Sequence, residues 1–209
     1  MKSLLPIFAS IFVAGCSVVG QSNVDTAPYT VLKSDDIQKI EVRKYDSMIL
    51  VSTSMSGKNG NSAFRELFKY IGGANEGATQ IAMTAPVIMD NKKITKKGTE
   101  ISMTAPVFMN ESADTSLMSF VMPNDFTLET TPKPTNPDVK VSELKDYKVA
   151  AIQFSGTLSD SNVDEHTIIL SAWITNNGYT AINKPVKAGY NGPFTLPMMR
   201  RNEVLIEVR

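Results

Sequence analysis

The heptad IAMTAPV, residues 81–87, returns as ISMTAPV at residues 101–107 with a single Ala-to-Ser change. Between the copies lies a polar, lysine-rich connection that ends in the turn-type residue Gly98. Apolar residues on either side of a polar turn predict two extended segments joined by a long hairpin loop. Pro86 and Pro106 lack an amide donor, so each copy should leave the sheet, or follow its edge, near its proline. On these residues alone, the plainer interpretation is a duplicated structural hairpin with buried methionines.

Outward from this stretch, the chain runs through one pattern twice. Apolar residues spaced at i, i+3, i+4 and i+7 predict a helix that begins at Asn61 or Ser62 and ends at Gly72. A second helix is predicted over residues 163–176, with Gly178 as its stop. Alternating or continuous apolar runs predict the strands. These are residues 40–43, 48–55, the two heptad segments, 117–122, 139–144, 148–154 and 205–209.

This order of elements predicts an α+β fold made of two pseudo-symmetric β-β-α-β-β halves. Periodicity by itself reaches only the α+β class. The two halves could pair their sheets into a closed or nearly closed antiparallel barrel with two flanking helices, which removes the exposed edges of an open sheet. Because no second composition class or long linker is present, we predict one domain over residues 36–209.

The N-terminus has the pattern of a secreted protein. Lys2 precedes an apolar run over residues 4–14, which is typical of a signal peptide and too short for a membrane span. The sequence VAGC that ends at Cys16 resembles a bacterial lipobox, so we expect residues 1–15 to be removed and Cys16 to be lipidated; an ordinary signal peptide is the alternative. Residues 16–35 then form a polar tether. Ser17 favours an outer-membrane lipoprotein that faces the periplasm of the bacterial envelope.

Composition excludes several function classes. The chain has 21 Lys and Arg against 21 Asp and Glu, which leaves no broad basic face for nucleic acid. With its one cysteine assigned to the anchor, the domain has no thiol nucleophile, thiolate metal site or disulfide. Its one histidine, His166, cannot supply a histidine cluster. The sequence therefore favours binding over catalysis, and we predict no enzymatic activity.

Three stretches resemble the SOUL haem-binding protein family. The first is the sequence MTAPV, at residues 83–87 and 103–107, preceded by FKYIGG at residues 68–73. The second is the C-terminal sequence YNGPFTLPMMRRNEV at residues 190–204, and the third is EVRKY at residues 41–45. The resemblance spans roughly residues 37–208. It implies a distorted barrel of two related halves, similar to effector-binding-like domains, and haem as a possible cofactor. Lys44 stands where a histidine is the proposed axial ligand in some members.

A tetrapyrrole needs an apolar slot, cations near its propionates and, optionally, an axial ligand for iron. The resemblance places this slot against the first helix and the closing loop. Phe64, Leu67 and Phe68 also lie on the stripe expected to cover the sheet, and plain core positions are the stronger interpretation for Phe64 and Leu67. Lys69 lies off that stripe and could equally be a solvated lysine. The ligand-binding residues that the resemblance implies are Phe64, Leu67, Phe68, Lys69, Tyr190 and Met198.

Other groups near these positions have two interpretations each. His166 is a weak axial candidate, because it borders the apolar stripe of its helix, where surface histidines are common. Arg200 and Arg201 could pair with the propionates of a tetrapyrrole. They could also pair with Glu203 or another carboxylate of the protein, which is the stronger interpretation.

Four functions follow from these observations. The first is non-catalytic binding of haem or a related tetrapyrrole by a lipoprotein held at the membrane through Cys16. The second is a carrier or sensor of another apolar small molecule. A tetrapyrrole-modifying enzyme is less well supported, and an envelope-structural role with an empty barrel is the fourth. Protein partners are not indicated.

Overall fold

The computed structural model describes residues 26–77, 80–81, 83–93, 115–192 and 194–209. The expected signal peptide, Cys16 and the second heptad copy at residues 101–107 lie outside these residues. The elements are β1 (Thr30–Asp35), β2 (Ile40–Ser54), α1 (Gly60–Ile71), β3 (Val87–Lys93), β4 (Thr115–Val121), β5 (Lys140–Phe154), α2 (Asp160–Asn176), β6 (Val186–Gly189), the 3-10 turn η1 (Pro197–Met199) and β7 (Asn202–Glu207).

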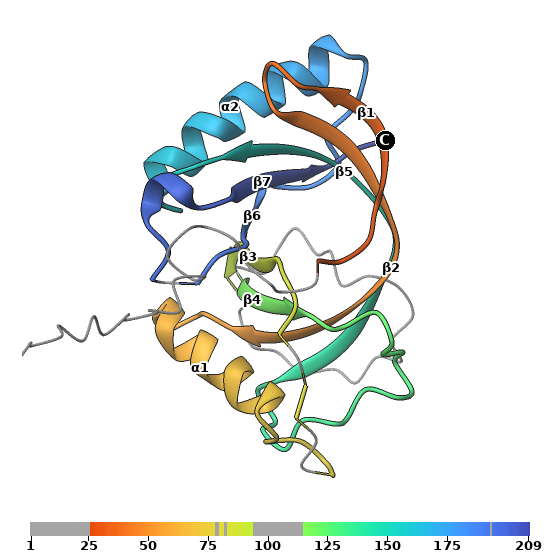
Figure 1. Ribbon diagram of the computed structural model, residues 1–209, viewed down its shortest axis with the longest axis vertical. Helices are drawn as coiled ribbons and strands as arrows, with labels where there is room; N and C mark the ends of the chain where they lie inside the picture. Colours follow the sequence, from red (N-terminus) through yellow and green to blue (C-terminus); the bar gives the residue numbers. More distant parts are fainter. Residues whose placement is uncertain (1–25, 78–79, 82, 94–114, 193) are drawn as a thin grey trace, which may run out of the picture.

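Six of the described strands close into an antiparallel barrel. Their order is β2-β4-β3-β6-β7-β5, and a further pairing of β5 with β2 closes the ring, while β1 adds to β2 from outside the ring. Figure 1 shows α2 against one half of this barrel and α1 against the other. The predicted antiparallel barrel with two flanking helices is confirmed.

Two long strands, β2 and β5, hold the halves together. They pair from Ile40 opposite Ile152 to Ser52 opposite Lys140. We expected two strands in each of these regions, separated by polar residues, and this was wrong. Asp46 and Ser47 are exposed and resemble a turn, but the pairing with β5 keeps the chain extended through them. The irregularity is local, at Asp146, where φ is 51°.

Both helices begin earlier than the pattern indicates. The N-cap of α1 is Asn59, whose side-chain oxygen accepts a hydrogen bond from the Ser62 amide at 2.8 Å, and not Asn61 or Ser62. Its predicted end at Gly72 is confirmed, since Gly72 is the C-cap. Helix α2 starts at Asp160 and ends before Gly178, which adopts the positive φ of 78° that glycine tolerates.

Two strands were missed. Residues 30–35, expected to be an irregular tether, form β1. Residues 186–189 form β6, a four-residue strand between Pro185 and the end of the barrel ladder at Gly189. The first heptad copy contributes to the barrel only from Val87 onward, because β3 starts immediately after Pro86. The strand predicted over residues 81–87, which was to leave the sheet near Pro86, is therefore wrong. The start of the polar connection, expected to be a loop, belongs to β3 as far as Lys93.

The core has three parts because both faces of the long strands are buried. Ile40 and Val42 of β2 pack outward under α2 together with Val204 and Ile206 of β7. The neighbouring positions point the other way, into the barrel, as strand alternation requires. The interior cluster contains Tyr45, Tyr147, Ala188, Tyr190 and Leu205. The third part lies under α1 and includes Leu67, Tyr70, Met118 and Phe120.

Candidate functional site

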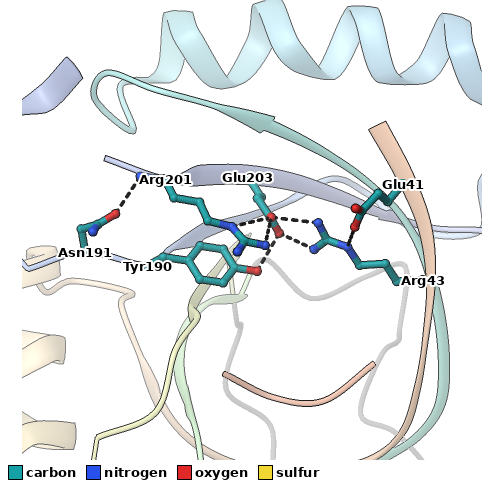
Figure 2. Close-up of polar contacts among 6 residues, drawn as sticks. All are labelled: Glu41, Arg43, Tyr190, Asn191, Arg201 and Glu203. Atoms are coloured by element: carbon teal, nitrogen blue, oxygen red, sulfur yellow. Dashed lines mark hydrogen bonds and ion pairs between the residues drawn. The ribbon is translucent and has the colours of Figure 1, made fainter. Parts of the chain in front are cut away.

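Charged residues occupy the barrel interior on the side that α2 covers. Arg43 of β2 and Glu203 of β7 have side chains that are 3% and 0% exposed. Arg43 donates two hydrogen bonds to the Glu203 carboxylate, from Nη1 to Oε2 at 2.7 Å and from Nη2 to Oε1 at 3.0 Å (Figure 2). Two parallel bonds of this kind fix both the position and the orientation of the pair.

Two more groups complete this arrangement, which we call the polar cluster (Arg43, Tyr190, Arg201 and Glu203). The Tyr190 hydroxyl donates to Glu203 Oε2 at 2.6 Å, and Arg201 donates to Oε1 from Nε at 3.0 Å and from Nη2 at 2.7 Å. At the rim, Arg43 Nε donates to Glu41 Oε2 at 2.6 Å, and a third of the Glu41 side chain is exposed. In Figure 2, dashed lines from Arg43, Tyr190 and Arg201 end on Glu203. Two further dashed lines join Arg43 to Glu41 and Arg201 to Asn191.

The cluster shifts the pKa of each of its members. Burial by itself raises the pKa of Glu203, but the hydrogen bonds and charges of Arg43 and Arg201 outweigh it and hold that pKa below its ordinary value. Burial lowers the pKa of both guanidinium groups, and Glu203 raises it further than burial lowers it. Burial, followed by the charge of Glu203, raises the pKa of Tyr190 well above 10.

These shifts decide what the cluster can do chemically. A carboxylate that accepts hydrogen bonds from three side chains and has a lowered pKa is a poor proton acceptor. The cluster is therefore suited to holding and orienting groups, and not to general acid–base catalysis. Among the described residues, no three His, Cys, Asp or Glu side chains are placed to hold a metal ion.

An aromatic side chain from the N-terminal segment covers the cluster. The Arg43 guanidinium lies 4.4 Å from the centroid of the Tyr29 ring, and the Tyr29 and Tyr45 ring centroids are 5.3 Å apart. Figure 1 shows this segment, in red, on the concave side of β2. Part of the region expected to be a tether thus belongs to the barrel interior.

The structure places the expected residues of α1 in different environments. Leu67 is completely buried and Phe64 is partly buried, both in the cluster under α1, which agrees with the plain core interpretation. Phe68 is 54% exposed, and its ring stacks on that of Phe64 at a centroid distance of 6.1 Å. Lys69 is exposed.

The expected residues outside α1 are not brought into this group. Tyr190 is buried in the barrel interior, in the polar cluster, and Met198 is 76% exposed on η1. His166 lies on α2, stacked on Phe154 at 4.1 Å, with Nδ1 2.7 Å from the carbonyl oxygen of Asn162. Of the two arginines, Arg201 pairs with Glu203, as expected, and Arg200 Nε donates to the carbonyl oxygen of Thr195 at 2.7 Å.

Sequence reasoning missed Arg43 and Tyr29 as site residues and saw Glu203 only as a partner for Arg201. The sequence pattern could have identified Arg43. Side chains alternate along a strand, so Arg43 lies on the face opposite to that of Ile40 and Val42. In a closed barrel that face is the interior, so an arginine there requires a buried acidic partner. The partner itself, 160 residues away in the sequence, has no local signature.

The fold and the buried interior side chains define the class of protein, which is a small antiparallel barrel with a polar cluster in a core lined by aromatic residues. The same fold occurs in the C-terminal domain of EcmrR, with a TM-score of 0.51 and 14% identity over 81% of this chain and 96% of that one. It also occurs in two proteins from Listeria innocua. One is an uncharacterized conserved protein (TM-score 0.57, 11% identity, 82% and 93% covered), and the other is described as a hydrolase (0.54, 12%, 82% and 92%). At these identities the likeness shows the fold alone.

The sequence relatives are more specific. The family model described as SOUL heme-binding protein matches residues 24–97 and 90–207. Human "Heme-binding protein 2" is 30% identical over 169 residues, which cover 78% of this chain and 75% of that protein. "Heme-binding protein 1" of Sus scrofa is 25% identical over 193 residues, 87% and 92% of the two chains. The chain belongs to the SOUL heme-binding protein family.

Proposed function

We propose that the protein binds haem or a related tetrapyrrole without transforming it. The family supports this ligand class, since the relatives are named as heme-binding proteins. The polar cluster supports binding over catalysis, because its one buried carboxylate is saturated by hydrogen bonds.

The outer face of α1 is the surface that best fits a tetrapyrrole, and its exposed aromatic carries the proposal. More than half of the Phe68 side chain is exposed, next to the partly buried Phe64 ring, and the two planes are only 16° from parallel. Helical geometry places Arg65 and Lys69, both exposed, on the flank of Phe68 opposite to Phe64. An apolar ring face beside two cations suits a flat macrocycle that carries propionates.

The acidic residue of this helix is turned to other partners. Glu66 accepts hydrogen bonds from Lys58 at 2.7 Å and from Thr53 at 2.8 Å. The flank formed by Arg65 and Lys69 therefore keeps its positive charge. No histidine is needed for a ligand held in this way, and His166 lies on the other helix, with Nδ1 engaged by a backbone carbonyl.

The test is an absorption titration with hemin. We expect a saturable Soret shift in the parent, and a weaker affinity by at least about tenfold in Phe68→Ser, since a large apolar contact is lost. The matched control is Ile168→Ser, which removes a 71% exposed apolar side chain from α2 and should leave the titration unchanged. Equal effects of the two substitutions would contradict the assignment of the α1 face. Metal-free porphyrin or ring-opened product during incubation would contradict the non-catalytic role.

We also propose that Cys16 carries a lipid that holds the domain at the outer membrane, facing the periplasm. The VAGC sequence after a short apolar run supports this. No helix in the part of the chain that the structure describes is long and apolar enough to cross a membrane. Metabolic labelling with palmitate should mark the parent and fail to mark Cys16→Ser; labelling of both would contradict the anchor.

A second candidate is a carrier or sensor of another apolar small molecule. The aromatic lining of the barrel interior, with Tyr45, Tyr147 and Tyr190, favours it. Native mass spectrometry of the protein purified from its own cells separates the two candidates by the mass of what co-purifies.

A further inference from the structure

Part of the connection between β6 and β7, which we call the apolar loop (residues 194–199), has an inverted burial pattern. Four of its large apolar side chains are exposed: Phe194 at 84%, Leu196 at 46%, Met198 at 76% and Met199 at 39%. The polar residue among them, Thr195, is only 5% exposed. A group of exposed apolar side chains of this kind marks a surface that contacts another protein or a membrane.

Backbone hydrogen bonds hold the apolar loop in place. The Gly156 amide, in the turn before α2, donates to the carbonyl oxygen of Pro197 at 2.7 Å. From the other side, Arg200 Nε donates to the carbonyl oxygen of Thr195 at 2.7 Å. The exposed apolar side chains are therefore a fixed feature of the surface.

The N-terminal segment enters the barrel next to this loop. Val87 of β3 lies opposite Gly189, the last residue of β6. Since β3 and β6 are antiparallel, the residues before Val87 lie at the end of the ladder where β6 continues into the β6–β7 connection. Thr26 forms a parallel bridge to Ala85, so the chain reaches Thr26 from this same end. Strand spacing and chain geometry place Thr26 within about 18 Å of Gly189.

The proposed lipid on Cys16 brings a membrane to this end of the barrel. Thr26 follows Cys16 by ten residues, which span at most about 36 Å even when fully extended. A domain anchored in this way keeps the end with the apolar loop close to the bilayer. Figure 1 shows the connection between β6 and β7 at the end of β7 that lies away from the C-terminus.

Burial of apolar area, and not charge, is what this surface offers to a bilayer. Arg201, which follows the apolar loop, is paired with the buried Glu203 at 2.7 Å. Asp160, at the start of α2, is paired with Lys187 at 3.3 Å. Attraction to acidic headgroups is therefore not required, and a contact driven by apolar burial should persist at high salt.

We propose that the apolar loop inserts into the lipid surface that holds the N-terminus, with Phe194 and Met198 among the acyl chains. The inference rests on the proposed lipid at Cys16, and it is separate from tetrapyrrole binding on α1. Insertion fixes the orientation of the barrel, with the apolar loop toward the membrane and the opposite end of β7 away from it.

The experiment uses the chain as cells lipidate it, reconstituted on phosphatidylcholine vesicles whose acyl chains carry bromine, a quencher of tryptophan emission. The one tryptophan of the parent, Trp173, is 5% exposed and should keep its emission. Phe194→Trp and Met198→Trp each add an indole that should be quenched and should emit at shorter wavelengths. Ile182→Trp is the matched control, because Ile182 is 50% exposed and its amide donates to the carbonyl oxygen of Glu207, at the opposite end of β7. The indole added there should keep its emission.

Three results would overturn the proposal. The first is quenching of Phe194→Trp that does not exceed that of Ile182→Trp. The second is quenching of Phe194→Trp that disappears at high salt. The third is a shift to shorter wavelengths that occurs without vesicles and grows with protein concentration, which would identify a second copy of the chain on the apolar loop.

Vesicle flotation tests the anchor separately. It should be strong in the parent and weak in Cys16→Ser, and equal flotation of the two would contradict the lipid at Cys16. In that case quenching at a lipid concentration that binds all of the protein still decides whether the apolar loop inserts. No hemin is present in these samples, so the result is independent of tetrapyrrole binding.

Discussion

Replacing Glu203 by Gln tests the polar cluster most sharply. The side chain is completely buried and receives hydrogen bonds from Arg43, Tyr190 and Arg201. Glutamine keeps the shape, but it removes the charge and turns two N–H donors toward guanidinium donors. Breaking one partner of a buried ion pair costs about 3–5 kcal/mol. For a domain of this size we expect the melting temperature to fall by about 6–20 °C.

Urea unfolding provides the assay, with the slope m checked to be unchanged so that the shift in midpoint reports stability. Glu66→Gln is the matched control, because Glu66 pairs with Lys58 at 2.7 Å with both side chains about one-quarter exposed. Glu66→Gln should lower the free energy of unfolding by about 0–1 kcal/mol. Adding Arg43→Gln to Glu203→Gln should cost less than the sum of the two single changes. A Glu203→Gln variant no less stable than Glu66→Gln would refute the structural role of the cluster.

Three further predictions follow from the same structure. Because the pKa of Glu203 is lowered in the folded state, the stability it contributes is present above its ordinary value of 4.5 and is lost as the pH falls below it. The difference in melting temperature between the parent and Glu203→Gln should therefore narrow in acid, and a constant difference would contradict the lowered pKa. Burial raises the pKa of Tyr45 to about 12, so stability should fall as the pH rises from 10 toward 12. The late component of the absorbance rise at 295 nm, which Tyr45 shares with Tyr70 and Tyr190, should become smaller in Tyr45→Phe. Asn59→Ala should lower the free energy of unfolding by about 1 kcal/mol through loss of the N-cap to the Ser62 amide, whereas Asn61→Ala, two residues later, should have little effect.

The class of fold could be predicted because local patterns and the repeat agree. The helix stripe of α1 and the glycine stop at Gly72 could be predicted. The strand β3 could not, because the heptad predicted a strand that ends near Pro86, whereas β3 begins after it. The lengths of β2 and β5 were not, because Asp46 and Asp146 have turn-like chemistry and only the pairing between the two strands keeps them in the sheet. β6 was missed since four residues carry too short a pattern.

The interior of the barrel shows why sites are harder to predict than folds. Glu203 sits in an apolar strand, and its significance depends on Arg43, which the fold brings to it from 160 positions away. Tyr29 stands in a segment whose composition is that of a tether, and only the bridge from Thr26 to Ala85 fixes it inside. The exposure of Phe68 was not predicted either, because its spacing placed it on the stripe expected to cover the sheet, whereas it is 54% exposed.

The claim that the protein holds a tetrapyrrole is tested most directly by native mass spectrometry after addition of hemin. We predict one added haem mass per chain in the parent, retained over a range of hemin excess and depleted in Phe68→Ser. A series of zero, one, two and more adducts that follows the hemin concentration, and that Phe68→Ser leaves unchanged, would contradict it.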